Sequence, residues 1–494
     1  MPAGRKTSSF ILELPLKTDP AQDRSLLVRL DCARQLYNAC LGECLKRLRL
    51  IRDSKDFQKA LRIQKGKKRA EAFNVINEKF GFRAGDIHKY TTKGRNACHI
   101  GEHLDANTCQ TVATRAFRAT QQYAFGKRGK PRFKGAGQFD SVEGKTNKQG
   151  IRWKDGRVHW DTLELPVLLD PIDKHKVQAH GLASPVKYVR IVRRKFKGNN
   201  RFYVQLVLEG KPRQKYEAGD GTVGLDLGPS TIAAVGKDFA ILETFCKELK
   251  SNQKQIRRVQ RAMHRSLRAV NPDAWNADGT VKEKAILRKS KGYRRLQVQL
   301  QEMYRKLAAH RKTLHGTLAN RILREARTIN TEKLSYRAWH CIFGKSVGFR
   351  APGMFVQMLR RKAESAGGVV NEFPTGNRLS QTCHCGSVKK KPLSQRWHTC
   401  ECGVSAQRDL YSAFLAMHVA GENLDTCRAE KAWPGAEPLL DLAVSRYKQT
   451  AKDTASGRVS FGYGRSQSRS PGKVYWFRLD LTVSSVLMVN CPFS

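Results

Sequence analysis

The sequence lacks the long apolar segments that would place it in a membrane. No hydrophobic run approaches the ~18–20 residues that cross a bilayer, and the N-terminal Met-Pro-Ala-Gly-Arg-Lys contains no apolar stretch like that of a signal peptide. Internal repeats are also absent. The hydrophobic fraction of 40% is too high for a disordered chain. These features argue against a membrane or secreted protein and favour a folded chain of about three domains.

Acidic residues are scarce. The 494 residues include 43 Asp and Glu against 92 Lys and Arg, which leaves a formal net charge of +49. A chain with this excess repels itself unless a polyanion spreads over its surface, and nucleic acid is the leading candidate. A basic linker at 126–135 and a stretch at 250–312, with 18 Lys or Arg against 4 Asp or Glu, concentrate the charge. The candidate nucleic-acid-binding residues are Lys127, Arg128, Lys130, Arg132, Lys134, Arg257, Arg258, Arg261, Arg294 and Arg295.

Hydrophobic spacing predicts a multidomain α+β chain. Apolar residues at three- and four-residue spacing predict helices over 26–50 and 105–125, a helical hairpin over 250–312 and a helix over 315–327. Short alternating or apolar runs predict strands at 9–17, 151–153, 157–160, 189–193, 202–208, 222–228 and 231–235. The last seventy residues suggest no chemistry, and the composition of 466–472 is typical of a flexible segment.

Four of the thirteen cysteines crowd into twenty positions. Cys383-His-Cys385-Gly and Cys400-Glu-Cys402-Gly are two near-identical turns, and two such turns can present four thiolates as a tetrahedron. That arrangement suits one structural Zn²⁺, and the glycine after each pair permits the turn. A redox dithiol is the alternative. His384 and His398 are expected to be bystanders, because four thiolates already complete a zinc site.

Three carboxylates are candidates for a second kind of metal site. Asp226 interrupts an apolar strand, where a charge is costly unless a cation compensates it. Glu332 follows in a short β-like segment, and Asp409 begins a helix seven residues after the last clustered cysteine. Each carboxylate alone could have a structural role. The segment from Asp226 to Ser230 also matches the phosphate-binding turn of actin-like kinases, and a carboxylate such as Asp409 is favoured at the start of a helix. Together they suit phosphodiester cleavage by two Mg²⁺ ions ~3.5–4 Å apart.

The order of these motifs carries a family resemblance. Gly-Leu-Asp226-Leu-Gly-Pro-Ser-Thr, a basic helical insert, Glu332-Lys-Leu, Ser380-Gln-Thr-Cys383 and Arg408-Asp409 follow one another. Over roughly residues 9–420, the chain resembles the TnpB family of transposon-encoded RNA-guided nucleases and the compact type V CRISPR effectors. The linker Gly129-Lys-Pro-Arg-Phe-Lys and the segment Arg201-Phe-Tyr-Val-Gln-Leu share in it.

The resemblance implies an RNA-guided DNA endonuclease. Asp226, Glu332 and Asp409 would be its catalytic residues and would hold two Mg²⁺ ions, and Cys383, Cys385, Cys400 and Cys402 would hold one Zn²⁺. A guide RNA and a double-stranded DNA target with a short adjacent motif are the implied partners, with no membrane. The implied localisation is cytoplasmic, nucleoid-associated in a prokaryote.

The resemblance also implies a domain order. A wedge β-barrel would be interrupted by a helical recognition lobe, and a split RuvC-like nuclease domain of RNase H fold would carry a zinc ribbon. The expected boundaries are 1–25 and 129–220 for the wedge, 26–128 for the recognition lobe, 221–379 and 406–425 for the RuvC-like domain with an insert at 250–312, 380–405 for the zinc ribbon and 426–494 for a partly flexible extension.

The chain departs from the family pattern at three places. The first zinc turn is Cys-x-Cys where Cys-x-x-Cys is usual, Gln407 stands where an acidic residue is common, and Tyr411-Ser-Ala-Phe-Leu replaces Asn-Ala-Ala-x-Asn. The lost amides would weaken support of the metal ligands. The alternative function is therefore a guided DNA-binding protein with an impaired nuclease, acting as a transcriptional or transposon regulator. If Tyr411 is the weak point, replacing it by Asn should leave cleavage equal or faster.

Overall fold

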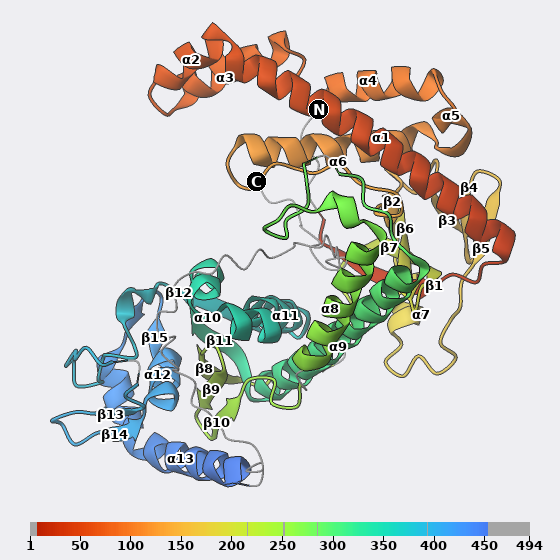
Figure 1. Cartoon of the computed structure of the whole chain (residues 1–494). Coiled ribbons are helices and arrows are strands. Elements are labelled where there is room, and N and C mark those ends of the chain that lie inside the picture. The colour runs from red at the N-terminus through yellow and green to blue at the C-terminus, as the bar shows by residue number, and fades with distance from the viewer. Residues whose placement is uncertain (1–6, 215, 250–251, 284, 393, 453–494) are drawn as a thin grey trace. The chain divides into compact units, whose positions relative to one another are not determined.

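The structure is a computed structural model that describes residues 7–214, 216–249, 252–283, 285–392 and 394–452. It divides into two compact units, of which the first ends at Arg213 and the second begins at Gln214. Both units combine helices and strands, so the predicted multidomain mixture of α and β is confirmed (Figure 1). The expected flexible segment 466–472 lies outside the described residues. Within the described ranges, no helix is both long and apolar enough to cross a membrane.

Six helices of the first unit form one continuous block between its first two strands. The first of them begins at a capping box, in which the Asp19 carboxylate accepts hydrogen bonds from the backbone amides of Ala21 and Gln22. Its apolar stripe, from Leu26 to Ile51, is buried against the last helix of the block. The helices are α1 (Pro20–Asp53), α2 (Lys55–Arg62), α3 (Lys67–Lys79), α4 (Ala84–Asn96), α5 (Ile100–His103) and α6 (Ala106–Ala124).

The main sheet of the first unit joins strands from both sides of that helical block. Its order is β1-β7-β6-β2 and every pairing is antiparallel. The first strand, before the helices, pairs with the seventh along its whole length, from Ser9 opposite Glu209 to Pro15 opposite Tyr203. The strands are β1 (Ser9–Pro15), β2 (Ser141–Glu143), β6 (Val186–Phe196) and β7 (Asn199–Glu209), with a small sheet of β3 (Arg152–Lys154), β4 (Arg157–Trp160) and β5 (Leu163–Pro166) and the helix α7 (Val177–Leu182).

The second unit is built on a five-stranded sheet of order β10-β9-β8-β11-β12. The three strands β8, β11 and β12 run parallel, whereas β8, β9 and β10 form an antiparallel meander. Parallel neighbours need a crossover connection, and helices provide both crossovers here. The strands are β8 (Gly221–Leu227), β9 (Thr231–Gly236), β10 (Phe239–Thr244), β11 (Ala326–Glu332) and β12 (Val369–Phe373).

Helices cover both faces of this sheet. Val223, Leu225 and Leu227 point to one face and pack with apolar residues of α9 (Lys291–Glu325) and α11 (Pro352–Ser365). On the other face, Ala233 and Val235 pack with α12 (Arg408–Met417) and α13 (Thr426–Lys452). Alternate residues of a strand point to opposite faces, so Gly224 and Asp226 belong to the face of α12. The remaining elements are α8 (Gln253–Val270), η1 (Pro272–Ala274), α10 (Tyr336–Arg350), η2 (Thr375–Asn377), β13 (Trp397–Thr399), β14 (Ser405–Gln407), β15 (Val419–Ala420) and β16 (Asn423–Leu424).

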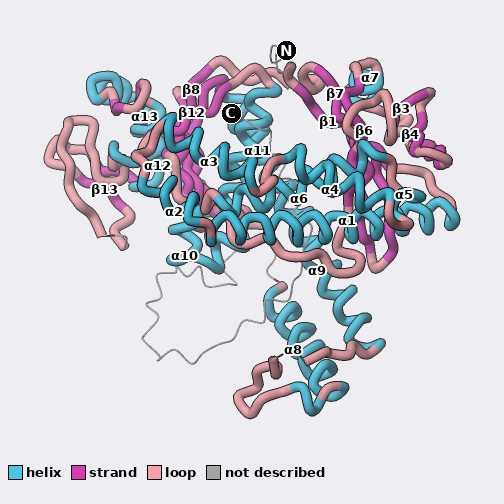
Figure 2. The backbone as a smooth tube through the Cα atoms, turned by 90° about the horizontal axis from the view of Figure 1, so that it is seen from above, coloured by secondary structure: helices cyan, strands magenta, loops and turns pink. Residues whose placement is uncertain are grey.

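The basic hairpin differs from its predicted form. The second helix, α9, runs without interruption for 35 residues to Glu325, so the separate helix expected over 315–327 is the last part of α9. The hairpin has a small core of its own, made of Ile256, Val259, Met263, Leu267, Tyr293 and Leu300. Figure 2 shows α8 and the first part of α9 standing away from the sheet of the second unit. This part of the hairpin therefore projects from the unit, with one buried apolar stripe between its two helices and a large basic surface.

Candidate functional site

Two of the three predicted carboxylates lie at the same edge of the central sheet. Asp226 is the penultimate residue of β8, and Glu332 is the last residue of β11. These strands are parallel neighbours in which Leu225 lies opposite Thr331. The carboxyl ends of parallel strands meet at one edge, and the register therefore puts Asp226 beside Glu332. Both side chains are partly exposed there.

A glycine brings the third carboxylate to this edge. A Cβ atom added at Gly224 would overlap the carbonyl oxygen of Ala413 and the amide nitrogen of Met417, so the backbone of α12 lies directly on β8. No side chain other than hydrogen fits between them. Asp409 is in the first turn of α12. On the same face, the Asn330 amide of β11 donates to the Val419 carbonyl just after α12, at 3.2 Å.

Three polar side chains surround the Asp409 carboxylate. The Thr231 hydroxyl donates a hydrogen bond to it at 3.3 Å, and the guanidinium groups of Arg408 and Arg396 lie 3.6 and 3.7 Å from its oxygens. The Arg408 side chain is almost fully buried. Thr231 and Arg408 lie in the sequence motifs that contain Asp226 and Asp409, but neither motif predicted a role for them, and Arg396 lies in no motif. The signal that could have identified Arg408 and Thr231 is their closeness in sequence to the carboxylates, since Arg408 precedes Asp409 and Thr231 begins the strand after the Asp226 turn.

The pKa of Asp226 responds to the charges of the other two carboxylates. Desolvation raises the pKa of Asp226 well above its usual range, the negative charges of Asp409 and Glu332 raise it further, and Arg408 opposes the shift. Desolvation also raises the pKa of Glu332, against a backbone hydrogen bond at Leu379. Like charges held together in a partly dry site favour protonation unless a cation neutralises them. The group therefore has the charge and the oxygen ligands that suit Mg²⁺.

The four clustered cysteines form a tighter site. Their sulfur atoms all lie within 4.8 Å of one another. In the described parts of the chain, no other group of three or more Cys, His, Asp or Glu side chains has its ligand atoms this close together. The Sγ atoms of Cys383 and Cys402 are 3.5 Å apart, and those of Cys385 and Cys400 are 3.6 Å apart. A tetrahedron with Zn–S bonds of ~2.3 Å has edges of about 3.8 Å. The cluster therefore fits one zinc ion.

The two cysteine turns share one backbone geometry. The amide of Cys383 donates to the Ser387 carbonyl at 2.8 Å, and the amide of Cys400 donates to the Val404 carbonyl at 3.0 Å. Gly386 and Gly403 have φ angles of +85° and +95°, which side chains other than hydrogen disfavour. The backbone amide of Cys402 lowers the pKa of Cys400 to about 7. The group that could hold a metal ion consists of the four cysteines and does not include His384 or His398.

Tyr411 ties the cysteine cluster to α12. Its hydroxyl accepts a hydrogen bond from the His384 amide at 3.1 Å and lies 3.3 Å from the Cys383 sulfur. The ring is buried, stacks on His398 at 4.3 Å and meets Trp433 of α13 edge-on at 5.3 Å. The expectation that Asn in place of Tyr411 would help cleavage is therefore not supported by these contacts. Gln407 caps α12, since its side-chain oxygen accepts from the Leu410 amide at 2.7 Å.

The predicted nucleic-acid-binding residues are at the surface of their own units. Lys127, Arg128, Lys130 and Arg132 are exposed in the linker after α6, and Lys134 is partly buried because its backbone pairs with the Asn38 amide of α1. Arg257, Arg258 and Arg261 of α8 and Arg294 and Arg295 of α9 are exposed. The helix α8 contains six Lys or Arg and no acidic residue. Both sets place positive charge at the surface, where it can attract a phosphate backbone.

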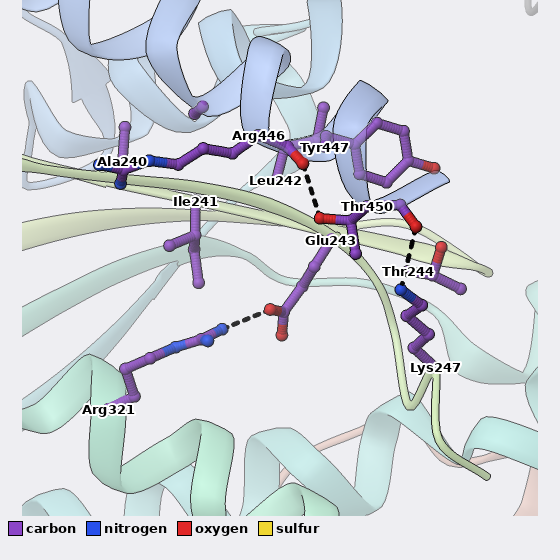
Figure 3. Close-up of a pocket in the computed structure, with 11 residues that line it drawn as sticks. Ala240, Ile241, Leu242, Glu243, Thr244, Lys247, Arg321, Arg446, Tyr447 and Thr450 are labelled. Carbon is purple, nitrogen blue, oxygen red and sulfur yellow. Dashed lines mark hydrogen bonds and ion pairs between the residues drawn. The ribbon is translucent and has the colours of Figure 1, made fainter. Parts of the chain in front are cut away.

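A pocket between β10 and α13 is a separate candidate (Figure 3). Glu243 of β10 pairs with Arg321 of α9 at 2.5 Å, and the Lys247 ammonium donates to the Thr450 carbonyl at 3.3 Å. Glu243 is the one carboxylate among its lining residues, and its charge is already balanced. The pocket therefore lacks the ligands for metal-ion chemistry.

Residues 353–415 match the family model described as "Cas12f1-like, TNB domain". The matched span covers most of α11, the four cysteines and α12 up to Leu415, including Asp409. No curated protein matches the chain.

Two solved structures overlap with most of it. "Cryo-EM structure of the Cas12f1-sgRNA-target DNA complex" is 11% identical, covers 82% of this chain and 98% of that chain, and has a TM-score of 0.39. "Cryo-EM structure of CRISPR-Cas12f Ternary Complex" is 10% identical, covers 82% and 83%, and has a TM-score of 0.27. The match over residues 353–415, which contain the cysteine cluster and Asp409, supports the assignment of the chain to the family of TnpB proteins and compact type V effectors.

Proposed function

We propose that the protein is an RNA-guided DNA endonuclease that hydrolyses phosphodiester bonds in a RuvC-like site. The observation that carries this proposal is the meeting of Asp226, Glu332 and Asp409, which are 106 and 77 residues apart in sequence, at one edge and one face of a sheet. Their charges act on one another through a partly desolvated site. A mixed sheet in which a carboxylate-bearing strand is flanked by antiparallel and parallel neighbours suits a nuclease domain of RNase H fold.

The three carboxylates would hold two Mg²⁺ ions. Bound there, the ions would activate water and stabilise the leaving 3′ oxygen. The side chains of this protein would bind these ions and orient the ligands. Glu332 and Asp226 would supply ligands from the rigid ends of two strands, and the Thr231 hydroxyl would orient Asp409 through its hydrogen bond.

The cysteine cluster would act as a structural zinc site. Four thiolates leave a zinc ion no open position for substrate. Through Tyr411, the cluster would hold α12 and hence Asp409 in place. This role accounts for the Tyr411 departure from the family pattern, because the side chain is part of the zinc ribbon and its ring contacts are with that ribbon and α13. It therefore weakens the alternative of an impaired, binding-only protein.

Guide RNA and target DNA would be the partners. The two neighbouring structures are named as complexes of Cas12f1 with guide RNA and target DNA, or as a ternary complex. This chain offers the exposed cations of the linker and of the α8–α9 hairpin for the phosphates of such partners. In the first unit, the sheet of β1, β7, β6 and β2 would be the wedge and the block α1–α6 the recognition lobe.

The experiment that tests the proposal begins with the RNA that co-purifies with the protein. Sequencing that RNA identifies the guide, and a DNA duplex complementary to it is then incubated with the complex and Mg²⁺. The expected result is cleavage that requires the matching guide and the metal ion. Cleavage of a chosen sequence by RNA-free protein, or intact DNA under all guide and metal conditions, would contradict the proposed function.

A further inference from the structure

The helix α10 bridges the loops that leave two of the carboxylates. Only three residues separate Glu332 from the first residue of α10, Tyr336. Toward its other end, the Ser346 hydroxyl donates to the Pro229 carbonyl at 2.5 Å, in the turn that follows Asp226. Figure 1 shows α10 beside α11 and β11. The helix therefore runs along the sheet edge where the carboxylates gather.

The second half of α10 is firmly held. The Arg350 guanidinium donates to the Phe245 carbonyl at 2.9 Å and to the Ser346 hydroxyl at 2.7 Å. The His315 ring nitrogen donates to the Arg350 carbonyl at 2.9 Å, and Arg311 donates to the Phe349 carbonyl at 3.0 Å. These bonds fix the end of the helix to α9 and to Phe245, the residue after β10, so α10 is a rigid support rather than a free lid.

The first half of α10 has a different character. Non-helical dihedral angles at Phe343 (φ −117°, ψ 27°) mark a kink between the two halves. The one buried residue of the whole helix is Val347, in the second half. In the first half Ile342 is 71% exposed, and Trp339 is partly exposed. Because α10 buries only Val347 against the rest of the chain, the apolar side chains of its first half are left for contact with a binding partner.

Aromatic rings line that face in a fixed order. Tyr336 packs over Gly353, where an added Cβ would lie 3.0 Å from the ring. Trp339 meets Tyr336 edge-on at 6.1 Å, and Phe343 meets Trp339 edge-on at 6.5 Å. The contact with Tyr336, which is packed against Gly353, holds the Trp339 ring at a defined angle. Its large plane makes Trp339 the best suited of these rings for stacking. We call Trp339, Ile342 and Phe343 the α10 face.

The charges around the α10 face select its partner. From Lys333 to Arg350, the end of α10, the chain has four Lys or Arg and no Asp or Glu. Arg337 and Lys345, on α10 itself, are exposed. Cations that alternate with aromatic rings suit a strand of nucleic acid, whose phosphates pair with the cations while its bases stack on the rings. In a duplex the base faces are covered by their neighbours, so the strand must be unpaired.

We propose that the α10 face binds the unpaired DNA strand that is cut at the carboxylates, by stacking its bases on Trp339. This inference rests on the proposed nuclease function and names a substrate contact for it. The contact would hold the strand over Asp226, Glu332 and Asp409, because α10 joins the loops that follow two of them. It would act on the bases without reading their sequence, since every base has a stacking face.

The first test locates the strand. Asp226→Ala protein, complexed with its guide RNA, is mixed with target DNA that carries 5-iodouracil around the cut position, irradiated and digested. We expect crosslinks in the peptide that contains Trp339. Crosslinks confined to other peptides would overturn the proposal. This binding test does not need cleavage, so it stands even if the proposed nuclease activity fails.

The second test separates stacking from structure. With the full guided complex, Trp339→Ala should weaken the apparent affinity for a DNA single strand that does not pair with the guide roughly 5- to 100-fold, and Trp339→Tyr should restore most of it. Ile172→Ala, which removes an 80% exposed apolar side chain from the loop between β5 and α7, is the matched control and should have no effect. Equal affinity of Trp339→Ala and the wild type would refute the contact.

The third test changes the DNA in place of the protein. Removing the base nearest the cut should slow the wild type about as much as Trp339→Ala does, and the two changes together should cost little more than either alone. Full additivity would show that Trp339 acts elsewhere. A wild-type dimer in solution that Trp339→Ala converts to monomer would assign the α10 face to a second copy of the chain and also overturn the proposal. Wild-type protein that cuts no guided target would count against the proposed function alone.

Discussion

The cysteine cluster and the carboxylate site differ in how the chain assembles them. The four cysteines lie within twenty positions, and two copies of one turn bring their sulfurs to within 4.8 Å of one another. The three carboxylates span 184 positions, and they meet only because β8 pairs with β11 and α12 rests on Gly224. A local site depends on turn geometry, whereas a site assembled over this distance depends on every packing contact between its elements. The two should therefore fail in different ways.

The largest effect is expected at the carboxylates themselves. Asp226→Ala, Glu332→Ala or Asp409→Ala should each reduce guided cleavage below detection, because one lost ligand dismantles the pair of ions. Binding of guide and target should persist, since phosphate contacts and base pairing supply the affinity. Combining two of the changes should add nothing measurable. Cleavage and binding assays on the same preparations check these expectations.

Asp238→Ala is the matched control for the carboxylates. Asp238 is an exposed carboxylate in the turn between β9 and β10, at the opposite edge of the same sheet. Its replacement should leave cleavage unchanged. Undiminished magnesium-dependent cutting by Glu332→Ala would remove Glu332 from the site.

The next effect concerns the cysteine cluster. Metal analysis of the wild type should find one zinc ion per chain. Cys383→Ser or Cys402→Ser should abolish that zinc and lower the free energy of unfolding by several kcal/mol. Cleavage should fall as well, through α12, without a change in the magnesium requirement. Cys427→Ser, at an exposed position of α13, should keep the zinc and the stability. Wild-type protein purified without chelator and free of zinc would contradict the assignment.

Gly224→Ala links the two regions. The added methyl group would collide with the backbone of α12, and backbone cannot move aside as a side chain can. We expect a loss of about 3 kcal/mol or more in the free energy of unfolding and a strong loss of cleavage with the zinc retained. Gly435→Ala in α13, where nothing lies within 4 Å of the added atom, should be neutral or slightly stabilising. Normal cleavage by Gly224→Ala would show that α12 does not position Asp409.

The smallest effects should come from Tyr411, and they distinguish its ring from its hydroxyl. Tyr411→Asn should lower the free energy of unfolding by about 3 kcal/mol, because it empties a buried space between His398 and Trp433. Tyr411→Phe should cost about 1 kcal/mol, since only the hydrogen bonds near Cys383 are lost. Thermal unfolding and zinc retention measure both. Faster cleavage by Tyr411→Asn would instead restore the view that this residue impairs the metal site.

The sequence predicted the parts of the molecule whose signals are local. The two Cys-x-Cys-Gly turns lie near each other in sequence, and the apolar stripe of α1 repeats at helical spacing. The strand that bears Asp226 was predictable from its apolar run. Asp226 itself was a candidate metal ligand because a charge in such a strand is costly unless a cation compensates it. The meeting of the carboxylates came from family resemblance, since no spacing rule connects positions 226, 332 and 409.

Contacts between distant elements could not be predicted. Tyr411 was interpreted as a missing amide near the metal ions, yet its ring is directed to the cysteine turns and to Trp433, a residue of a helix that had been assigned no chemistry. The sequence analysis gave the segment of α10 no role. Only the packing shows that Val347 alone is buried there.

The pairing of β1 with β7 has a consequence for how the protein is made. Ser9 is opposite Glu209, so the first strand has no partner until some two hundred residues have left the ribosome. At roughly 5–20 residues per second, that delay is on the order of ten seconds or more. The helices α1 to α6 can fold meanwhile on local contacts, and the waiting strand is short, with Glu13 and Pro15 to discourage wrong partners. Synthesis order thus favours the helical block as the nucleus on which the sheet is later closed.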